Sequence, residues 1–534
     1  MTSPTPQTVK DEARALYHRG LKEKAEGRLE RAIEFFDAAL AAQPDFPEAL
    51  CSGGYILQST GHHEGALAFY SRAIELDPDY FDALFNRGCL LFALNRLDLA
   101  VADFTRATVL QPNDAGAQSN LGAALHQSGK LIESVEVLRK ALALDPALLE
   151  AELNLGSALR RLGREDEAHE AFLRAALLKP DCAEAYCGLG IVARAKGEFK
   201  EAMDYYDCAL AFDPKLEEAL SSRGTLQLLL GNFEQGWEGY ESRWIDGHRP
   251  VPISDARFDA ARPDTIAGKR VLVVNDHGLG DTIQFFRYVK LLSDHGADVT
   301  FAGPAKLRQL LETSGAKVAW RDTNDFTGTF DERIAISSLP RAFATVEKTI
   351  PADVPYLAAD PERVEFWRAR MPGDGLKIGL CWRGSQDFRV DPRRSFSPAA
   401  LAPLAALSGV ELYALHMDVG ADELPAEVAA KVHVFGDGFD RGPDAFVDTA
   451  AVMTNLDLVV TCDTSIAHLA GALGHPVWVT LRHIAEWRWM LEREDSPWYP
   501  TMRLLRAEAG DDWFKLYKHI ANDIAALAKE KEKD

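Results

Sequence analysis

The chain has 534 residues and a formal net charge of −22, from 59 Lys and Arg against 81 Asp and Glu. This acidic balance argues against a surface that binds nucleic acids or anionic membranes in general, so an anionic ligand needs a local site. Hydrophobic residues make up 47% and charged residues 26%, which is typical of folded globular protein and excludes a mainly disordered chain. Since one domain usually holds about 100–200 residues, we expect about three structural units.

The cysteines and the first residues bear on the cellular compartment. The seven cysteines are odd in number, widely spread and set mostly within apolar patterns, which predicts reduced, buried thiols. Cys182 and Cys187 lack the spacing of a zinc site. The first residues lack the apolar core of a signal peptide, and no window reaches the roughly 18 consecutive apolar residues that a membrane helix needs. We therefore expect a cytoplasmic protein without a membrane span.

A proline recurs every 34 residues through the first part of the chain, at Pro44, Pro78, Pro112, Pro146, Pro180 and Pro214. This is the tetratricopeptide period, in which each repeat is a pair of helices. Each unit also has a glycine where the helices approach and, on the second helix, a large residue followed three positions later by alanine. In the first unit these are Gly20, Phe36 and Ala39. The pattern predicts six repeats over residues 13–216, after a disordered tail over residues 1–12.

A seventh unit departs from the repeat pattern towards its end. Its segment GNFEQGWEGYESRW has Gly236 where alanine is usual, and it adds aromatic bulk at Trp237, Tyr240 and Trp244. Terminal repeats of a solenoid differ from the others because they cover the end of the stack. We interpret residues 217–246 as a partial repeat, or cap, that docks the solenoid onto the C-terminal half of the chain.

The sixth position of each repeat is expected to face the concave surface of the solenoid. It is asparagine in three consecutive units, at Asn86, Asn120 and Asn154. An amide side chain has donors and an acceptor, so this row can pair with the backbone of a bound peptide whatever its sequence. The row resembles the asparagine ladder of protein O-GlcNAc transferases. The alternative is that each asparagine satisfies backbone groups close to it.

Beyond a linker over residues 247–268, rich in Pro, Asp and Arg, strand and helix patterns alternate, which is typical of a parallel sheet. The strand-like runs are RVLVVN, DVTFAG, KIGLCW, ELYALH, KVHVFG, LDLVVTCD and PVWVTL. KIGLCW comes after an irregular stretch and opens a second lobe. We predict two Rossmann-like lobes, over residues 269–373 and 374–530, with a ligand cleft at the carboxyl ends of their strands.

Two loops come directly after such strand ends. GLGD (Gly278–Asp281) joins the first strand to its helix, and DTSIAH (Asp463–His468) comes after the strand LDLVVT. A helix N-terminus with free amides and a hydroxyl suits a phosphate, although Thr464 and Ser465 fit ordinary N-caps equally well. The first loop lacks the full G-x-G-x-x-G fingerprint, which disfavours a dinucleotide cofactor.

The chain resembles the bacterial tetratricopeptide-fused glycosyltransferases, which are related to heptosyltransferases and protein O-GlcNAc transferases of the GT-B fold. The segments that carry the resemblance are VNDHGLGDTIQFFRYV, SLPRAFAT, DPRRS, DTAAVMTNLDLVVTCDTSIAHLAGALGHPVWV and EWRWMLEREDSPWYPTMRLLR. The resemblance covers nearly the whole chain beyond residue 12. It implies a solenoid joined to a GT-B module, with a nucleotide-sugar donor in the C-terminal lobe and an acceptor over the N-terminal lobe.

The resemblance also implies roles for single residues. Asp281 matches the loop aspartate proposed as the general base in heptosyltransferases. The donor site it implies contains Arg394, Ser395, Asp463, Thr464, Ser465 and His468, with Gly278 and Gly280 as loop glycines. His468 also fits a packed core histidine, and Asp463 a residue that fixes its loop.

The sequence departs from the common family pattern at two places, which leaves the donor and the acceptor open. Asp276-His277 stands where Glu-Gln is usual, and Glu486 stands where Asp is usual.

The resemblance implies an inverting glycosyltransferase that moves a sugar from a nucleotide-sugar to a hydroxyl of a protein acceptor held by the solenoid. A flagellin is the leading candidate acceptor, because related bacterial fusions modify flagellins. We expect no metal or other cofactor, since the only D-x-D pair is Asp77-Pro78-Asp79, between two repeats. The alternatives are transfer to a saccharide or lipid-linked acceptor, as in heptosyltransferases, and a catalytically inactive scaffold.

Overall fold

The structure is a computed structural model that describes residues 6–244, 253–259, 261–262, 265–384, 394–417, 419–420, 423–436 and 438–531. The chain divides into two compact units, Met1–Lys196 with Asp207–Asp213, and Gly197–Tyr206 with Pro214–Asp534. No helix within the described ranges is long and apolar enough to cross a membrane.

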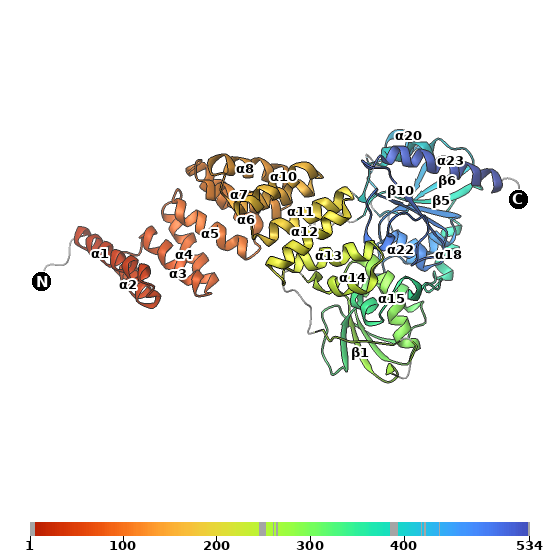
Figure 1. Cartoon of the computed structure of the whole chain (residues 1–534), viewed down its shortest axis with the longest axis horizontal. Helices are drawn as coiled ribbons and strands as arrows, with labels where there is room; N and C mark the ends of the chain where they lie inside the picture. Colours follow the sequence, from red (N-terminus) through yellow and green to blue (C-terminus); the bar gives the residue numbers. More distant parts are fainter. Residues whose placement is uncertain are drawn as a thin grey trace. The chain divides into compact units, whose positions relative to one another are not determined.

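Helices α1 to α14 follow the repeat pattern, two helices to each repeat. They are α1 (Pro6–Ala25), α2 (Leu29–Ala42), α3 (Pro47–Ser59), α4 (His63–Leu76), α5 (Phe81–Ala93), α6 (Leu97–Leu110), α7 (Ala115–Gln127), α8 (Leu131–Leu144), α9 (Leu149–Arg161), α10 (Glu165–Leu178), α11 (Ala183–Lys196), α12 (Phe199–Phe212), α13 (Glu217–Leu229) and α14 (Phe233–Tyr240). The first of these form successive pairs, coloured red to orange in Figure 1. The predicted disordered tail over residues 1–12 is wrong beyond residue 5, because α1 begins at Pro6; residues 1–5 lie outside the described ranges.

In the first five repeats, the signature glycine lies where the two helices touch, as the repeat pattern predicted. A Cβ built on Gly88 would lie 2.8 Å from the ring of Phe104, and one built on Gly54 would lie 2.9 Å from the ring of Tyr70. Both rings are fully buried. Real Cβ atoms essentially never come closer than 3.0 Å to such atoms, so a side chain at these positions forces the helices apart.

The cap, residues 217–246, contains a closer helix crossing and reaches both lobes of the second unit. A Cβ on Gly239 would lie 2.7 Å from the Cα of Gly224, so the backbones of α13 and α14 are in contact. The buried indole of Trp237 donates a hydrogen bond of 2.8 Å to the carbonyl of Thr345, and its ring packs edge-on against Trp487 at 5.2 Å. The 3-10 turn η1 (Glu241–Arg243) comes directly after α14.

The first lobe is a parallel sheet with strand order β3-β2-β1-β4. Its elements are β1 (Arg270–Val274), α15 (Leu279–Asp294), β2 (Asp298–Ala302), α16 (Arg308–Glu312), β3 (Val318–Arg321), β4 (Glu332–Ala335) and α17 (Leu339–Ala342). Strands β3 and β4 were not predicted, and the stretch that contains them was described as irregular. Each has only four residues, and β3 lacks a buried side, so neither shows a clear apolar pattern.

The second lobe is a parallel sheet with strand order β10-β9-β8-β5-β6-β7. Its strands are β5 (Leu376–Cys381), β6 (Val410–Ala414), β7 (Val432–Val434), β8 (Leu458–Cys462), β9 (Val477–Leu481) and β10 (Met502–Arg506). Its helices include α18 (Pro361–Arg368), α19 (Ala402–Ala405), α20 (Ala426–Ala429), α21 (Val447–Thr454), α22 (Ser465–Ala472) and α23 (Trp513–Lys531). A buried core joins one face of the sheet to α19, α20 and α23, while α18 and α22 lie on the other side (Figure 1).

Strand order reverses at one place in each sheet, between β1 and β4 and between β5 and β8. In open α/β sheets, ligands bind in the crevice outside the carboxyl ends of the strands at such a switch point. The fold therefore directs attention to the loops after β1, β4, β5 and β8.

Two predicted boundaries differ from the structure. Within the predicted linker 247–268, the peptide N–H of Phe258 donates to the carbonyl of Ala342 at 2.7 Å and its side chain is buried, so this part belongs to the first lobe. Residues 245–252, 260 and 263–264 lie outside the described ranges. Helix α18, assigned to the first lobe by the boundary at residue 373, packs on α21 of the second lobe, and Trp367 Nε1 donates to Asp448 Oδ1 at 2.7 Å.

We expect Gly88→Ala to lower the stability of the repeats by about 1–3 kcal/mol, because overpacking against Phe104 outweighs the helix preference of alanine. Gly65→Ala, in α4, is the matched control, since a Cβ at Gly65 meets only the side chain of Leu57 in α3, at an ordinary 3.5 Å. Thermal unfolding followed by circular dichroism checks both variants. A Gly88→Ala protein that unfolds at or above the wild-type temperature contradicts the packing argument.

Candidate functional site

The N-terminal ends of α15 and α22 meet, one from each lobe. A Cβ built on Gly280 would lie 3.2 Å from the Cα of Ser465 and 3.0 Å from Cδ2 of His468. The close approach therefore depends on glycine at this position. Helix N-termini carry partial positive charge and free amides, so two that converge form a favourable environment for an anion. The structure thus brings together the two loops singled out in the sequence, Gly278–Asp281 and Asp463–His468.

Asp281, in the first turn of α15, forms an ion pair with Arg488 of the 3-10 turn η8 (Trp487–Trp489). Their side chains are 22% and 10% exposed. Burial would raise the pKa of Asp281, but Arg488, followed by His277, lowers it overall. The carboxylate is therefore ionised, as a proton acceptor must be, and Arg488 weakens its basicity.

Gln284 lies one turn beyond Asp281 and was not recognised from the sequence. Its oxygen accepts a hydrogen bond of 2.7 Å from Arg488 Nε, and its side chain is fully buried. Its amide nitrogen has no hydrogen-bond partner among the described residues. A buried donor without a partner costs about 1–3 kcal/mol, so such groups are commonly paired with a water or a ligand.

Thr464 is the N-cap of α22, which fits the simpler of its two interpretations. Its hydroxyl oxygen accepts a hydrogen bond of 3.3 Å from the peptide N–H of Ile466 and lies 3.5 Å from Cys381 Sγ, at the end of β5. Ser465 is the first residue of the helix. Both residues therefore stand at the switch point between β5 and β8.

Arg394 and Ser395 are the only residues of the DPRRS motif within the described ranges; Asp391–Arg393 lie outside them. Arg394 Nη1 is 4.0 Å from Asp463 Oδ2, and Ser395 Oγ accepts from the peptide N–H of Gly384 at 3.0 Å. Burial raises the pKa of Asp463 against the effect of Arg394. Arg394, 29% exposed, is thus a cation beside the N-terminus of α22.

His468 is packed inside the second lobe. Its Nδ1 lies 3.0 Å from the hydroxyl of Tyr499, its ring stacks on Trp489 at 5.5 Å, and 5% of the residue is exposed. Burial lowers the pKa of His468 to about 3, so the imidazole is neutral near pH 7. This arrangement fits the packed-histidine alternative, although the ring edge also borders the Gly280 loop.

The switch point of the first lobe is filled by residues of the cap. Arg243, in η1, donates to Asp276 Oδ2 from Nη2 at 2.9 Å and from Nε at 3.1 Å. Ser337, just beyond β4, also donates to Asp276. His277 lies between Asp276 Oδ2, 3.1 Å from its Nδ1, and the Tyr240 hydroxyl, 3.1 Å from its Nε2. From the sequence, Tyr240 was recognised only as docking bulk and Arg243 was missed, since nothing local marks their partners in the chain.

Two of the three asparagines of the predicted ladder donate hydrogen bonds within their own helices. Asn120 Nδ2 donates to the carbonyl of Gly116 at 2.9 Å, and Asn154 Nδ2 donates to that of Glu150 at 2.8 Å. Asn86 Nδ2 contacts Cys51 Sγ at 3.6 Å instead. Each amide nitrogen has a second hydrogen available, so these contacts leave both interpretations open.

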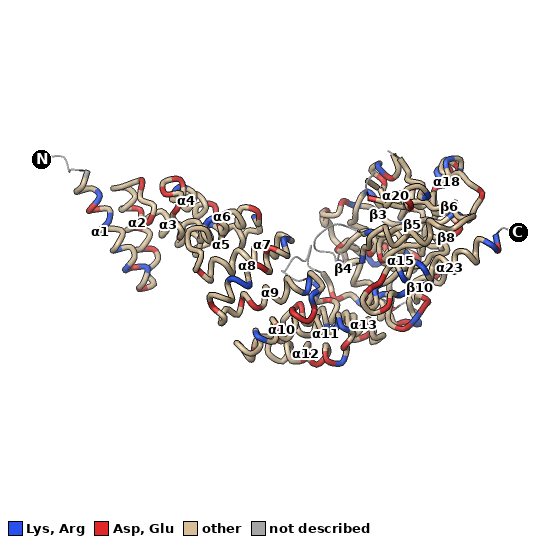
Figure 2. Tube along the Cα trace, turned by 90° about the horizontal axis from the view of Figure 1, so that it is seen from above, with Lys and Arg blue, Asp and Glu red and all other residues tan. Residues whose placement is uncertain are grey.

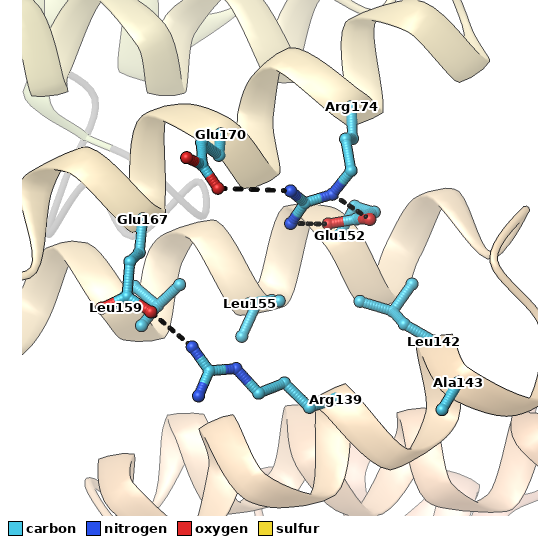
Figure 3. Close-up of a pocket in the computed structure, with 9 residues that line it drawn as sticks. All are labelled: Arg139, Leu142, Ala143, Glu152, Leu155, Leu159, Glu167, Glu170 and Arg174. Carbon is cyan, nitrogen blue, oxygen red and sulfur yellow. Dashed lines mark hydrogen bonds and ion pairs between the residues drawn. The ribbon is translucent and has the colours of Figure 1, made fainter.

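The solenoid also contains a pocket of about 300 Å³ between α8, α9 and α10 (Figure 3). Its charged side chains pair with one another across the pocket wall. Arg174 donates to both oxygens of the buried Glu152, at 2.7 and 3.1 Å, and Arg139 pairs with Glu167. Basic and acidic residues are likewise interspersed along the solenoid helices in Figure 2. Within the described ranges, no group of three or more His, Cys, Asp or Glu side chains is arranged to hold a metal ion.

Comparison with known proteins identifies the repeats. Models described as tetratricopeptide repeat match residues 13–46, 85–148 and 153–217, and one described as TPR repeat matches residues 54–94. The repeat period predicted from the sequence is thereby confirmed, and this part of the chain consists of tetratricopeptide repeats.

One curated relative is the protein FlbA of Caulobacter vibrioides, 28% identical over 318 residues. The match covers 55% of this chain and 52% of the relative, so the chain spans about half the length of the relative it matches.

Solved structures also match the chain. The peptide-binding repeat protein YrrB is 24% identical, with a TM-score of 0.32, over 35% of this chain and 97% of that one. A tetratricopeptide repeat protein from Parabacteroides merdae is 18% identical, with a TM-score of 0.39, over 45% of this chain and 95% of that one.

The lowered pKa of His468 gives the protein a testable pH dependence. The ordinary pKa is 6.5 and the pKa in the folded state is about 3. The contribution of the neutral, packed ring to the free energy of unfolding is therefore fully present above pH 6.5 and is lost as the pH falls towards 3. At pH 5 this loss amounts to about 2 kcal/mol. We therefore expect His468→Gln to unfold with a smaller drop in midpoint temperature between pH 7 and pH 5 than the wild type.

The control for this measurement is His519→Gln, at an exposed position of α23, which should behave like the wild type. An equal drop in midpoint temperature for His468→Gln and wild type contradicts the assignment of His468 as a buried, neutral histidine.

Proposed function

We propose that the chain is a glycosyltransferase of the GT-B type that moves a sugar from a nucleotide-sugar to a hydroxyl of a protein acceptor. The observation that carries the proposal is the convergence of the α15 and α22 N-termini at Gly280, with Asp281 on one side and Arg394 on the other. Glycosyl transfer needs a base for the acceptor hydroxyl and positive charge for the leaving diphosphate. This arrangement offers both within one site.

In the proposed reaction, the diphosphate of the donor lies at the N-terminus of α22, near Arg394. Backbone amides of that helix and the guanidinium offset the negative charge that grows on the leaving group. Asp281 accepts the proton of the acceptor hydroxyl while the hydroxyl oxygen attacks the anomeric carbon. The attack comes from the side opposite the leaving diphosphate, so the configuration at this carbon is inverted. The proposal assigns no metal or cofactor, as expected from the sequence.

The ion pair with Arg488 sets a condition on this mechanism. While Arg488 holds Asp281, the carboxylate is a weak base. Arg488 also has Glu486 within 3.4 Å, so a second carboxylate is available when a ligand draws the guanidinium away. A bound diphosphate is a ligand of that kind, and donor binding would then release the base.

We expect Asp281→Asn to lower kcat by roughly 10²-fold or more and to leave the donor KM nearly unchanged, as for the loss of a base. The measurement starts with thermal shifts against UDP-, CMP-, GDP- and ADP-sugars, because a specific ligand stabilises the folded state by mass action. Hydrolysis of the stabilising donor is then measured for wild type and variant. The matched control is Asp259→Asn, a surface carboxylate of the first lobe.

Retention of most of the wild-type kcat by Asp281→Asn removes this residue as the base. Absence of stabilisation and hydrolysis with every donor contradicts transferase activity and favours the scaffold alternative, in which the repeats serve only to bind proteins.

The tetratricopeptide repeats support recruitment of the acceptor, for which a flagellin is the candidate derived from the family resemblance. If the asparagine row holds the acceptor backbone, Asn86→Ala, Asn120→Ala and Asn154→Ala together should raise the acceptor KM, since three contacts of about 0.5–1.5 kcal/mol each are lost. Donor hydrolysis should not change. Alanine favours helix, so unfolding of the repeats would not account for a loss.

The control for the triple variant replaces exposed polar residues on the second helices of the same repeats with alanine, at Arg106, Lys140 and Glu170. A wild-type acceptor KM in the asparagine variant shows that recruitment uses another surface of the solenoid.

A further inference from the structure

The crevice at the switch point of the first lobe is occupied by the solenoid's own last turn. Open α/β sheets bind ligands at this place. Here Arg243 enters it, with only 6% of its side chain exposed, and pairs with the fully buried carboxylate of Asp276. Asp276 belongs to the loop after β1, which leads within five residues to Asp281.

Arg243 fixes both loops that border this crevice. Besides Asp276, after β1, it donates to Ser338 Oγ, after β4, at 2.7 Å. Glu241 accepts from Arg243 Nη1 at 3.0 Å and from the hydroxyl of Ser338 at 2.9 Å. A buried guanidinium whose donors are satisfied on two loops restrains both, and removing such a partner leaves an uncompensated buried charge.

Tyr240 extends the same restraint to His277. The tyrosine hydroxyl lies at hydrogen-bonding distance from Nε2, at 3.1 Å, and Asp276 Oδ2 lies 3.1 Å from Nδ1 as an ion-pair contact without hydrogen-bond geometry. Contacts at both nitrogens fix the orientation of a histidine ring. His277 is 26% exposed and immediately precedes the glycines of the Gly278–Asp281 loop. Asp276-His277 is also where the sequence departs from the common pattern of the family it resembles.

We propose that the last turn of the solenoid is part of the active site, with Arg243 and Tyr240 as positioning residues for the Asp276-His277 pair and, through it, for the loop that carries Asp281. This inference rests on the proposed function. The inference gives the cap a different role from the six repeats before it. Those repeats recruit the acceptor, whereas the cap sets the geometry in which Asp281 acts.

The proposal predicts that the cap affects turnover even when no protein acceptor is present. A recruitment role raises the acceptor KM and spares donor hydrolysis by water. A positioning role lowers the kcat of donor hydrolysis and spares the donor KM, because the donor lies at the other lobe and only the base is displaced.

The experiment compares Arg243→Lys and Tyr240→Phe with Glu238→Gln in the full chain. Glu238 also ties α14 to the first lobe, through Arg341 at 2.7 Å, but its ion pair is exposed and involves neither switch loop. We expect Arg243→Lys to lower the kcat of donor hydrolysis about tenfold or more at an unchanged donor KM. Tyr240→Phe should show a smaller fall in the same sense, and Glu238→Gln should stay within about twofold of wild type, as for loss of an exposed ion pair.

Equal kcat values for Arg243→Lys and Glu238→Gln, whether both normal or both reduced, overturn the proposal, since the cap would then act only as a docking element. Thermal unfolding of each variant identifies any that has lost its fold. Arg243→Lys is used instead of Arg243→Ala because it keeps the positive charge beside the buried carboxylate of Asp276.

A second readout does not depend on turnover. The imidazole signals of His277, assigned by their loss in His277→Gln, are monitored by nuclear magnetic resonance. Arg243→Lys and Tyr240→Phe should shift them, and Glu238→Gln should not. If the wild type turns over no nucleotide-sugar, the proposed function fails while this measurement still decides whether the cap positions His277. Unchanged His277 signals in both variants overturn the positioning role.

Discussion

The close approach of α15 and α22 at Gly280 is the constraint on which the site depends. Two helix N-termini brought together add their partial positive charges, and Arg488 and Arg394 add full ones. Asp281 offsets part of this charge in the absence of a ligand, through its ion pair with Arg488. The chain as a whole is acidic, with a net charge of −22, so the proposed anionic ligand depends on these local cations and helix N-termini rather than on the overall charge.

Within the second unit, the cap contacts both lobes. Trp237 contacts the first lobe through Thr345 and the second through Trp487, and Arg243 closes the switch point between β1 and β4. Trp487 is the neighbour of Arg488, which holds Asp281. The same short segment therefore contacts the residue before Arg488 and the loop that leads to Asp281. Within this segment, the glycines at 224 and 239 allow the backbones of α13 and α14 to touch.

Local patterns predicted much of the fold, and contacts between distant residues account for the parts they missed. The 34-residue period set the repeats, and apolar runs located β1, β2 and β5 to β9. Short strands such as β3 carry too few residues for a pattern, and α18 joins the second lobe through Asp448, which no local signal indicates. In the site, glycines and helix N-cap residues marked both loops in the sequence. Arg488, in contrast, pairs with Asp281 across 207 positions of the chain. That partnership exists only once both lobes have folded.

The most direct test of the account is a crystal structure of the full chain with the nucleotide-sugar that stabilises it most. The account predicts a diphosphate within hydrogen-bonding distance of the peptide N–H groups of Ser465 and Ile466 and of the Arg394 guanidinium, with Arg488 drawn away from Asp281. A diphosphate bound elsewhere, or an Asp281–Arg488 pair that is unchanged at full donor occupancy, would contradict it.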